Sequence, residues 1–188
     1  EMATIPDDKG WSTGVSVVDI NQDGLQDIYI CRVGKFASLQ NHNLLLVCKG
    51  LDKNGVPFYE DQSVDYGLDF SGFSTQAAFL DYDLDGDLDM YLLNHSLRYS
   101  STFQPRDNYT NSFDSLSGDR FYRNDGKKFT DITKQAGIQS SVIGYGLGIA
   151  VSDINLDGYP DLYIANDFQE NDYLYINRGD GSFSDELD

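Results

Sequence analysis

A nine-residue acidic loop, with the pattern D-x-[DN]-x-D-G-x-x-D, occurs three times in this chain, each time between two short runs of apolar and aromatic residues. The loops span residues 19–27, 81–89 and 153–161. Oxygen side chains at positions 1, 3, 5 and 9, with a glycine at position 6 for a sharp turn, suit a hard cation such as Ca²⁺, which takes roughly 6–8 oxygen ligands. Three matches in register therefore predict up to three structural calcium sites.

The expected calcium ligands are the side chains at positions 1, 3, 5 and 9 and the backbone carbonyl at position 7 of each loop. They are Asp19, Asn21, Asp23, Leu25 and Asp27 in the first loop, Asp81, Asp83, Asp85, Asp87 and Asp89 in the second, and Asp153, Asn155, Asp157, Tyr159 and Asp161 in the third. The second loop has a carboxylate at position 3, where the other two have an amide. We expect this loop to bind Ca²⁺ most tightly, because affinity rises with the charge of the ligands.

Two other interpretations of the acidic loops are less favourable. An EF-hand shares positions 1, 3, 5 and 6 but requires a Glu at position 12 and flanking helices. Position 12 is Ile30, Leu92 or Ile164, so a loop between strands is favoured. Acidic turns without a metal are also disfavoured, because four carboxylates clustered between Asp81 and Asp89 would repel one another without a cation.

The similarity among the three units extends beyond the loops, as in a structural repeat. An aromatic residue stands eight positions before the first Asp of each loop, and a tyrosine stands ten positions after it: Trp11, Phe73 and Tyr145, then Tyr29, Tyr91 and Tyr163. Apolar, β-branched and aromatic runs on both sides of a tight loop predict a β-hairpin. A second hairpin follows in each unit, at 44–48 and 56–59, 120–123 and 128–130, and 173–176 and 182–184.

Four-stranded units that share a core aromatic and cannot bury their sheet faces alone predict an all-β fold, a β-propeller with about three blades in this chain. Closed propellers have about 4–8 blades, so these three would be part of a larger, seven-bladed ring. The expected divisions are residues 1–10, the end of a preceding blade, and blades at 11–70, 71–142 and 143–188. Inserts at 32–42 and 94–119 should emerge on the face opposite the calcium loops.

The overall charge limits the classes of partner. The 188 residues carry 31 acidic and 13 basic side chains, a formal charge of −18. Binding to nucleic acid or to an anionic membrane surface is not expected, because no basic patch is available to neutralise phosphates. The sequence also has no apolar run of the roughly 20 residues that a membrane helix needs. Its first residues lack a signal pattern, and we expect a mature or excised piece of an exported protein.

Cys31 and Cys48 are the two cysteines. If residues 27–31 and 44–48 are neighbouring antiparallel strands, the two cysteines end different strands, on the order of 13 Å apart. We therefore expect two buried free thiols rather than a disulfide.

The residues resemble the FG-GAP/VCBS repeat family, which includes the integrin α-subunit propeller and many secreted bacterial proteins. The resemblance is carried by the three loops and by two phrases, Phe121-Tyr-Arg-Asn-Asp-Gly-Lys-Lys-Phe-Thr and Leu174-Tyr-Ile-Asn-Arg-Gly-Asp-Gly-Ser-Phe. It is closest to the bacterial and cartilage-acidic-protein branch. The resemblance implies a propeller with Ca²⁺ in the first hairpin loop of a blade and an extracellular or cell-surface location, on a bacterial outer-membrane surface or in the periplasm. The insert at 94–119 has no equivalent in that family, so ligand specificity does not follow from the resemblance.

The favoured function is a non-enzymatic, calcium-stabilised propeller module that binds a protein or a glycan through the loops opposite the calcium face. The candidate partner-binding residues are Lys35, Phe36, Tyr99, Phe103, Arg106 and Tyr109. No catalytic residues are assigned, because neither His42 nor His95 lies near a Cys or Ser in the sequence context of a catalytic nucleophile. The alternative is the propeller of a calcium-dependent polysaccharide lyase or hydrolase. A purely structural subunit of a larger surface assembly is a third hypothesis.

Two N-glycosylation patterns, Asn94-His-Ser96 and Asn108-Tyr-Thr110, fall within the second insert. A surface loop is expected there.

Overall fold

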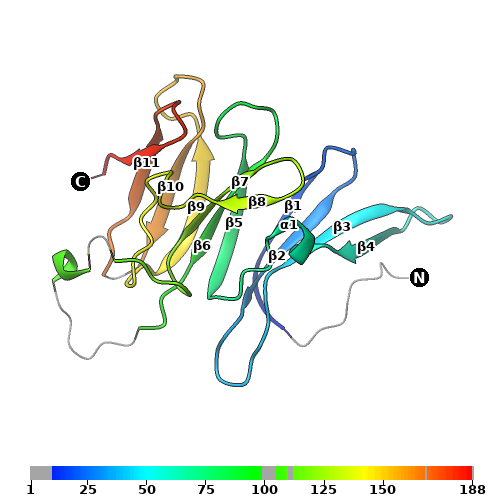
Figure 1. Ribbon diagram of the computed structural model, residues 1–188, viewed down its shortest axis with the longest axis horizontal. Helices are drawn as coiled ribbons and strands as arrows, with labels where there is room; N and C mark the ends of the chain where they lie inside the picture. The colour runs from blue at the N-terminus through cyan, green and yellow to red at the C-terminus, as the bar shows by residue number, and fades with distance from the viewer. Residues whose placement is uncertain (1–9, 99–104, 110–111, 168, 188) are drawn as a thin grey trace.

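The computed structural model describes residues 10–98, 105–109, 112–167 and 169–187, which form three four-stranded antiparallel sheets side by side (Figure 1). The strands of the first sheet are β1 (Trp11–Val18), β2 (Asp27–Val33), β3 (Leu44–Leu51) and β4 (Pro57–Asp61); of the second, β5 (Ser74–Leu80), β6 (Asp89–Asn94), β7 (Arg120–Asn124) and β8 (Phe129–Asp131); of the third, β9 (Gly146–Ser152), β10 (Asp161–Asn166), β11 (Tyr173–Asn177) and β12 (Phe183–Asp185). The fold is all-β, as predicted, and each sheet is one of the expected four-stranded units.

In each sheet the strands pair in chain order, so every unit is a simple meander. The first strands of the three units lie next to one another, β1 against β5 and β5 against β9. This is the arrangement of neighbouring propeller blades around an axis, although the three sheets do not close into a ring. The short helices α1 (Ser63–Tyr66) and η1 (Arg106–Asn108) lie in connecting segments. No helix of the described residues is both long and apolar enough to cross a membrane.

The hydrophobic core lies between the sheets. One cluster, with Tyr29, Leu45 and Leu92, fills the space between the first and second sheets, and another, with Tyr91 and Phe121, lies between the second and third. Tyr29 and Tyr91 are fully buried because each faces the following sheet. The equivalent Tyr163 alternates with the inward-facing residues of β10, so it points to the outer face of the third sheet and is 36% exposed.

The aromatic residues before each acidic loop do not form a shared core, which corrects the sequence-based expectation. Trp11 is 58% exposed, whereas Phe73 and Tyr145 are partly buried and directly precede β5 and β9. Phe73 forms a β-bridge with Val33, and Tyr145 forms one with His95. These two aromatics therefore join each blade to the preceding one.

The connecting loops divide between the two ends of the blades (Figure 1). The three acidic loops lie at the upper end in this view, and the inserts at the lower end, as strand alternation predicted. The inserts are slightly shorter than expected, because β2 extends to Val33 and β6 to Asn94. Cys31 and Cys48 are buried and unpaired, as predicted.

Candidate metal centre

The three acidic loops have the same backbone conformation. The residue at position 4 has a left-handed φ of 58° in Gln22, 61° in Leu84 and 63° in Leu156. Such values are uncommon for residues other than glycine. The glycine two positions later also has a positive φ in each loop, 85° at Gly24, for example. Two left-handed residues so close together curl the loop around its own carboxylates.

The last Asp of each loop fixes the loop to the sheet. Asp89 Oδ2 accepts a hydrogen bond from the backbone N–H of Tyr82 at 3.2 Å, and its Oδ1 accepts one from Asn124 in the third strand of the blade at 2.8 Å. Asp27 and Asp161 make the equivalent pair of bonds. All three carboxylates are buried. This position therefore joins the loop and two strands, in addition to its expected role as a calcium ligand.

In the first and third loops, backbone N–H groups donate hydrogen bonds to the side-chain oxygens at positions 1 and 3. The N–H of Asp23 donates to Asp19 Oδ1 at 3.0 Å and to Asn21 Oδ1 at 3.1 Å. The N–H of Asp157 does the same with Asp153 and Asn155, at 3.1 and 3.0 Å. The side-chain oxygens expected to hold a cation in these loops are thus turned towards N–H groups.

The second loop differs from the other two in its unsatisfied oxygens. Asp81 Oδ1, Asp83 Oδ1 and Asp87 Oδ1 are buried and have no hydrogen-bond partner among the described residues. One oxygen from each of Asp81, Asp83 and Asp89 lies within 4.8 Å of the others. Within the described part of the chain, no other three acidic, His or Cys side chains come together in this way. Buried oxygens without donors are costly unless a cation occupies the space between them.

The raised pKa values of the second loop also favour a bound cation. Burial, reinforced by neighbouring carboxylates, raises the pKa of Asp89 to about 7 and that of Asp87 to about 6. Burial and the charge of Asp85 also raise the pKa of Asp83. A cation between these groups would favour their ionised forms. The residues of the second loop therefore fit a hard divalent cation such as Ca²⁺.

Sequence reasoning assigned only the backbone carbonyl of Asp87 to the metal. Asp87 Oδ1 is also a buried oxygen without a donor, but the Asp87 side chain is not in the group of Asp81, Asp83 and Asp89 whose oxygens come together. The expected position-7 carbonyls of Leu25, Asp87 and Tyr159 stay predictions. The acidic residue at position 7, which the other loops lack, is the signal that could have revealed this fifth carboxylate.

Side-chain contacts link the second loop to both neighbouring blades. The side-chain amide of Gln22, in the first loop, donates to the Gly86 carbonyl. Asn177 Nδ2, at the end of β11, donates to the Tyr82 carbonyl at 2.8 Å. These two hydrogen bonds therefore connect the second loop to the blades on either side.

The candidate partner-binding residues lie apart from the acidic loops. Lys35 and Phe36 are exposed in the loop between β2 and β3. Arg106 Nε donates to the buried Glu170 Oε1 at 2.6 Å, so this guanidinium also holds the fold together. Tyr109 is partly buried, and the Arg98 guanidinium lies 6.0 Å from the centre of its ring. Tyr99 and Phe103 lie outside the described residues.

One glycosylation pattern does not lie in a surface loop, contrary to expectation. Asn94 is the last residue of β6 and is fully buried, and its Nδ2 donates to the Gly118 carbonyl at 2.8 Å. A glycan could not be attached to this side chain in the folded protein. Asn108 is exposed, as a surface loop requires.

The model of the FG-GAP-like repeat matches residues 153–187, from the first Asp of the third acidic loop through β12. The third blade contains an FG-GAP-like repeat. This repeat contains one of the nine-residue loops and the strand pairs β10–β11 and β11–β12. The first and second blades share its loop pattern and its strand order. A comparison with curated proteins finds no match to the chain.

Proposed function

We propose that this protein is a non-enzymatic, calcium-stabilised β-propeller module of an exported or cell-surface protein. The observation that carries the proposal is the meeting of Asp81, Asp83 and Asp89, where Asp81 Oδ1 and Asp83 Oδ1 are buried without a donor. Ca²⁺ held there would satisfy these oxygens and reduce the repulsion among the carboxylates. A chain with a formal charge of −18 gains further from each bound cation.

We infer an extracellular or periplasmic setting, which the same chemistry supports. The loops have no bidentate Glu, and calcium modules outside the cell work at high calcium concentrations, with dissociation constants of about 10⁻⁴–10⁻³ M. The third blade's FG-GAP-like repeat agrees with a propeller-type module. We infer that the remaining blades of a seven-bladed ring come from elsewhere in the protein or from another chain.

The binding role belongs to the end of the molecule opposite the acidic loops. The longest connection, between β6 and β7, and the connection between β2 and β3 both lie there (Figure 1). Rigid scaffolds commonly present recognition residues on such loops. We propose a protein partner at this end, with the acidic loops stabilising the blades.

Calcium titration tests the stabilising role. Thermal unfolding of the protein is followed in EGTA, in Ca²⁺ and in Mg²⁺, and isothermal titration calorimetry counts the bound ions. We expect Ca²⁺ to raise the unfolding midpoint and Mg²⁺ to raise it less, since Mg²⁺ keeps its water more tightly. An identical midpoint in EGTA and Ca²⁺ would remove the proposed role.

The binding role requires a separate experiment. Residues 99–105 and 107–110 are replaced by Gly-Ser linkers of equal length, which keep Arg106, the partner of the buried Glu170, and the buried Asn94 and Asp119 in place. Partners that cross-link to the original protein are identified by mass spectrometry and then tested as purified proteins. We expect the linker variant to lose their binding while calcium still stabilises it. Retained binding would place the interaction elsewhere.

A further inference from the structure

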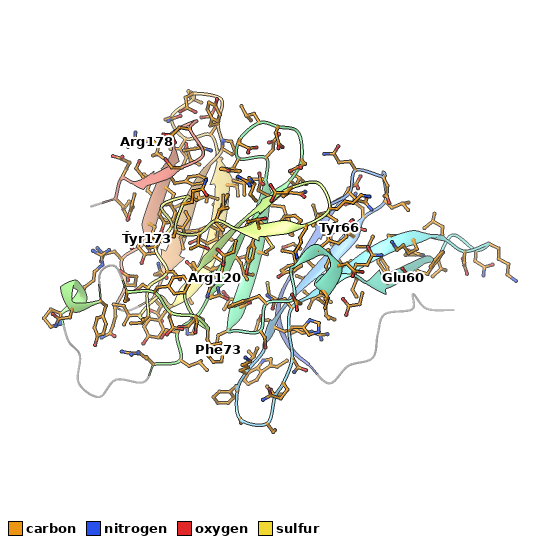
Figure 2. The ribbon with its side chains drawn as sticks, viewed as in Figure 1. Glu60, Tyr66, Phe73, Arg120, Tyr173 and Arg178 are labelled. Atoms are coloured by element: carbon orange, nitrogen blue, oxygen red, sulfur yellow. The ribbon has the colours of Figure 1, made fainter. Side chains whose placement is uncertain are left out.

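An apolar cavity lies at the end of the blades opposite the acidic loops, between the first and second sheets. Its volume is about 190 Å³, and its walls include Trp11, Val33, Phe36, Phe73, His95 and Leu97. Figure 2 shows Phe73 at this end of the molecule. The cavity is thus lined by residues of β1 and β2, of the two inserts and of the junction before β5.

Three large apolar side chains around this cavity are exposed to solvent. Trp11 is 58% exposed, and Phe36 and Leu97 are each 47% exposed. They come from three separate segments, namely β1, the loop after β2 and the segment after β6. Single exposed apolar residues are ordinary, but a group of them around one cavity indicates a binding surface.

The hydroxyl groups of the cavity wall are already used within the fold. Thr13 Oγ1 donates to the Ser74 carbonyl at 2.6 Å, and Thr75 Oγ1 donates to the Leu93 carbonyl at 3.2 Å. Ser74 Oγ accepts from Asn43 Nδ2 at 2.9 Å. A sugar needs partners for its hydroxyl groups, and these side chains are already engaged. The lining therefore favours an apolar side chain over a glycan.

The volume of the cavity limits the size of the group that it can hold. Pockets that enclose whole small molecules measure roughly 300–1,000 Å³. The cavity near Phe73 is smaller than that, and it suits a single large side chain. Aromatic and large aliphatic anchors in such cavities carry much of the binding energy of protein interfaces.

The charges around the cavity contrast with those of the whole chain. The sequence contains 31 acidic residues, yet residues 28–51 and 90–106 contain none. Lys35 adjoins Phe36, and Arg98 adjoins Leu97, and both basic residues are exposed. The Arg98 guanidinium also faces the Tyr109 ring. Basic side chains next to two of the cavity residues are complementary to an apolar side chain flanked by carboxylates.

We propose that this cavity, which we call the Trp11–Phe36–Leu97 cavity, binds one large apolar side chain of a partner protein, within an acidic segment. Lys35 and Arg98 pair with the carboxylates next to that side chain. This inference rests on the proposed binding role of the insert end, and it specifies the chemistry of the partner segment.

A peptide library tests the inference directly. Random linear peptides displayed on phage are selected on the immobilised protein in the presence of Ca²⁺. The expected consensus has one aromatic, Leu or Met residue with Asp or Glu within a few positions. A synthetic peptide of that consensus is then titrated while Trp11 fluorescence is followed. Since Trp11 is the one tryptophan of the chain, a blue shift reports that its surroundings have become drier.

Matched variants locate the peptide. We expect Phe36→Ser and Leu97→Ser to weaken binding about tenfold or more, because each removes part of the cavity wall. Lys35→Glu and Arg98→Glu should weaken it several-fold, less so at high salt. The controls are Leu51→Ser, which changes another exposed apolar residue at the end of β3, and Lys53→Glu in the turn before β4. Neither control should change binding.

Four results would overturn the inference. These are the absence of any enriched peptide, a consensus without an apolar anchor or without acidic residues, unchanged binding in Phe36→Ser and Leu97→Ser, and a blue shift produced by neutral oligosaccharides instead. The proposed function has its own readout. If the partners lose binding to the linker variant but keep it with the cavity variants, the module's binding role stands and the cavity assignment fails.

Discussion

The hydroxyl of Tyr91 donates a 2.7 Å hydrogen bond to Asp119 Oδ2, and the other oxygen of this carboxylate accepts one from the Asn94 N–H at 2.7 Å. Asp119 directly precedes β7, so it fixes the end of the second insert to β6. Asp172 binds Tyr163 and the Asn166 N–H in the same way in the third blade. In the first blade Asn43 holds the same place, but its Nδ2 donates to the Tyr29 hydroxyl oxygen while its Oδ1 accepts from the Arg32 N–H. The three tyrosines therefore anchor the connection between the second and third strands of each blade, and Tyr29 and Tyr91 are core residues as well.

Asp119 should make stability depend on pH. Burial raises its pKa to about 7. Between pH 4 and 7 the native state keeps a proton that the unfolded chain has lost, so stability falls as pH rises through this window. Asp119→Asn removes the titrating group and this dependence, which amounts to at most about 1.4 kcal/mol per pH unit. Urea unfolding of both proteins from pH 4 to 8, with Ca²⁺ present throughout, measures the difference.

The first blade supplies the precedent for this substitution, because Asn43 already makes the equivalent bonds as an amide. We therefore expect Asp119→Asn to fold. Parallel stability curves for the two proteins over the whole pH range would contradict the raised pKa.

The two cysteines should be unreactive in the native protein. Cys31 and Cys48 are buried, and burial raises the pKa of the Cys31 thiol to about 12, so little thiolate forms at neutral pH. A thiol reagent such as DTNB should detect two thiols in guanidinium chloride and none within minutes under native conditions. Detection of fewer than two thiols after unfolding without a reductant would instead indicate a disulfide.

The sequence predicted the blades because their periodic features are local. The loop pattern, the alternating apolar residues and the hairpin turns each depend on neighbours in the chain, and the strands formed close to the predicted positions. The residue before the third strand of each unit, Asn43, Asp119 or Asp172, was overlooked although it is an Asx residue in all three. Its partner is a tyrosine at a different distance in each blade, because the inserts differ in length.

The sequence predicts which residues form the acidic loops, but not which of their oxygens lack a hydrogen-bond donor. The pattern identified all three loops alike, whereas the structure separates the second loop from the others. In the first loop the Asp23 N–H donates to Asp19 and Asn21, while Asp81 Oδ1 and Asp83 Oδ1 have no donor among the described residues. That difference depends on backbone orientation, which a spacing pattern does not specify. Trp11 is a comparable case, since Phe73 and Tyr145 at the same position each bridge to the preceding blade, and the described residues include no blade before Trp11.

Exchange of the residue at position 3 should exchange calcium affinity between loops. Asp83→Asn gives the second loop the pattern of the other two, and we expect it to weaken calcium binding there about tenfold, because one charged ligand is lost. Asn21→Asp should strengthen binding at the first loop. Calorimetric titration with Ca²⁺ measures both, and Asp52→Asn, in an exposed turn outside the loops, serves as the control. Equal affinities in the original protein and Asp83→Asn would exclude Asp83 as a ligand.

Arg120 should be the most sensitive basic residue of the second blade. Its guanidinium lies between two rings, 5.1 Å from the centre of Phe70 and 4.6 Å from that of Phe113, and it pairs with Asp131 at 3.1 Å. It also donates to the Ser115 carbonyl at 2.9 Å, so it connects the first blade, the insert and β8. Lysine keeps the charge but lacks the flat, forked group that stacks and bonds in several directions. We therefore expect Arg120→Lys to lower the free energy of unfolding by about 2 kcal/mol. Arg123→Lys, at a partly exposed pair with Asp125, should cost less than about 1 kcal/mol in the same urea titration. A similar loss in both variants would show that the stacked arrangement of Arg120 contributes nothing beyond its charge.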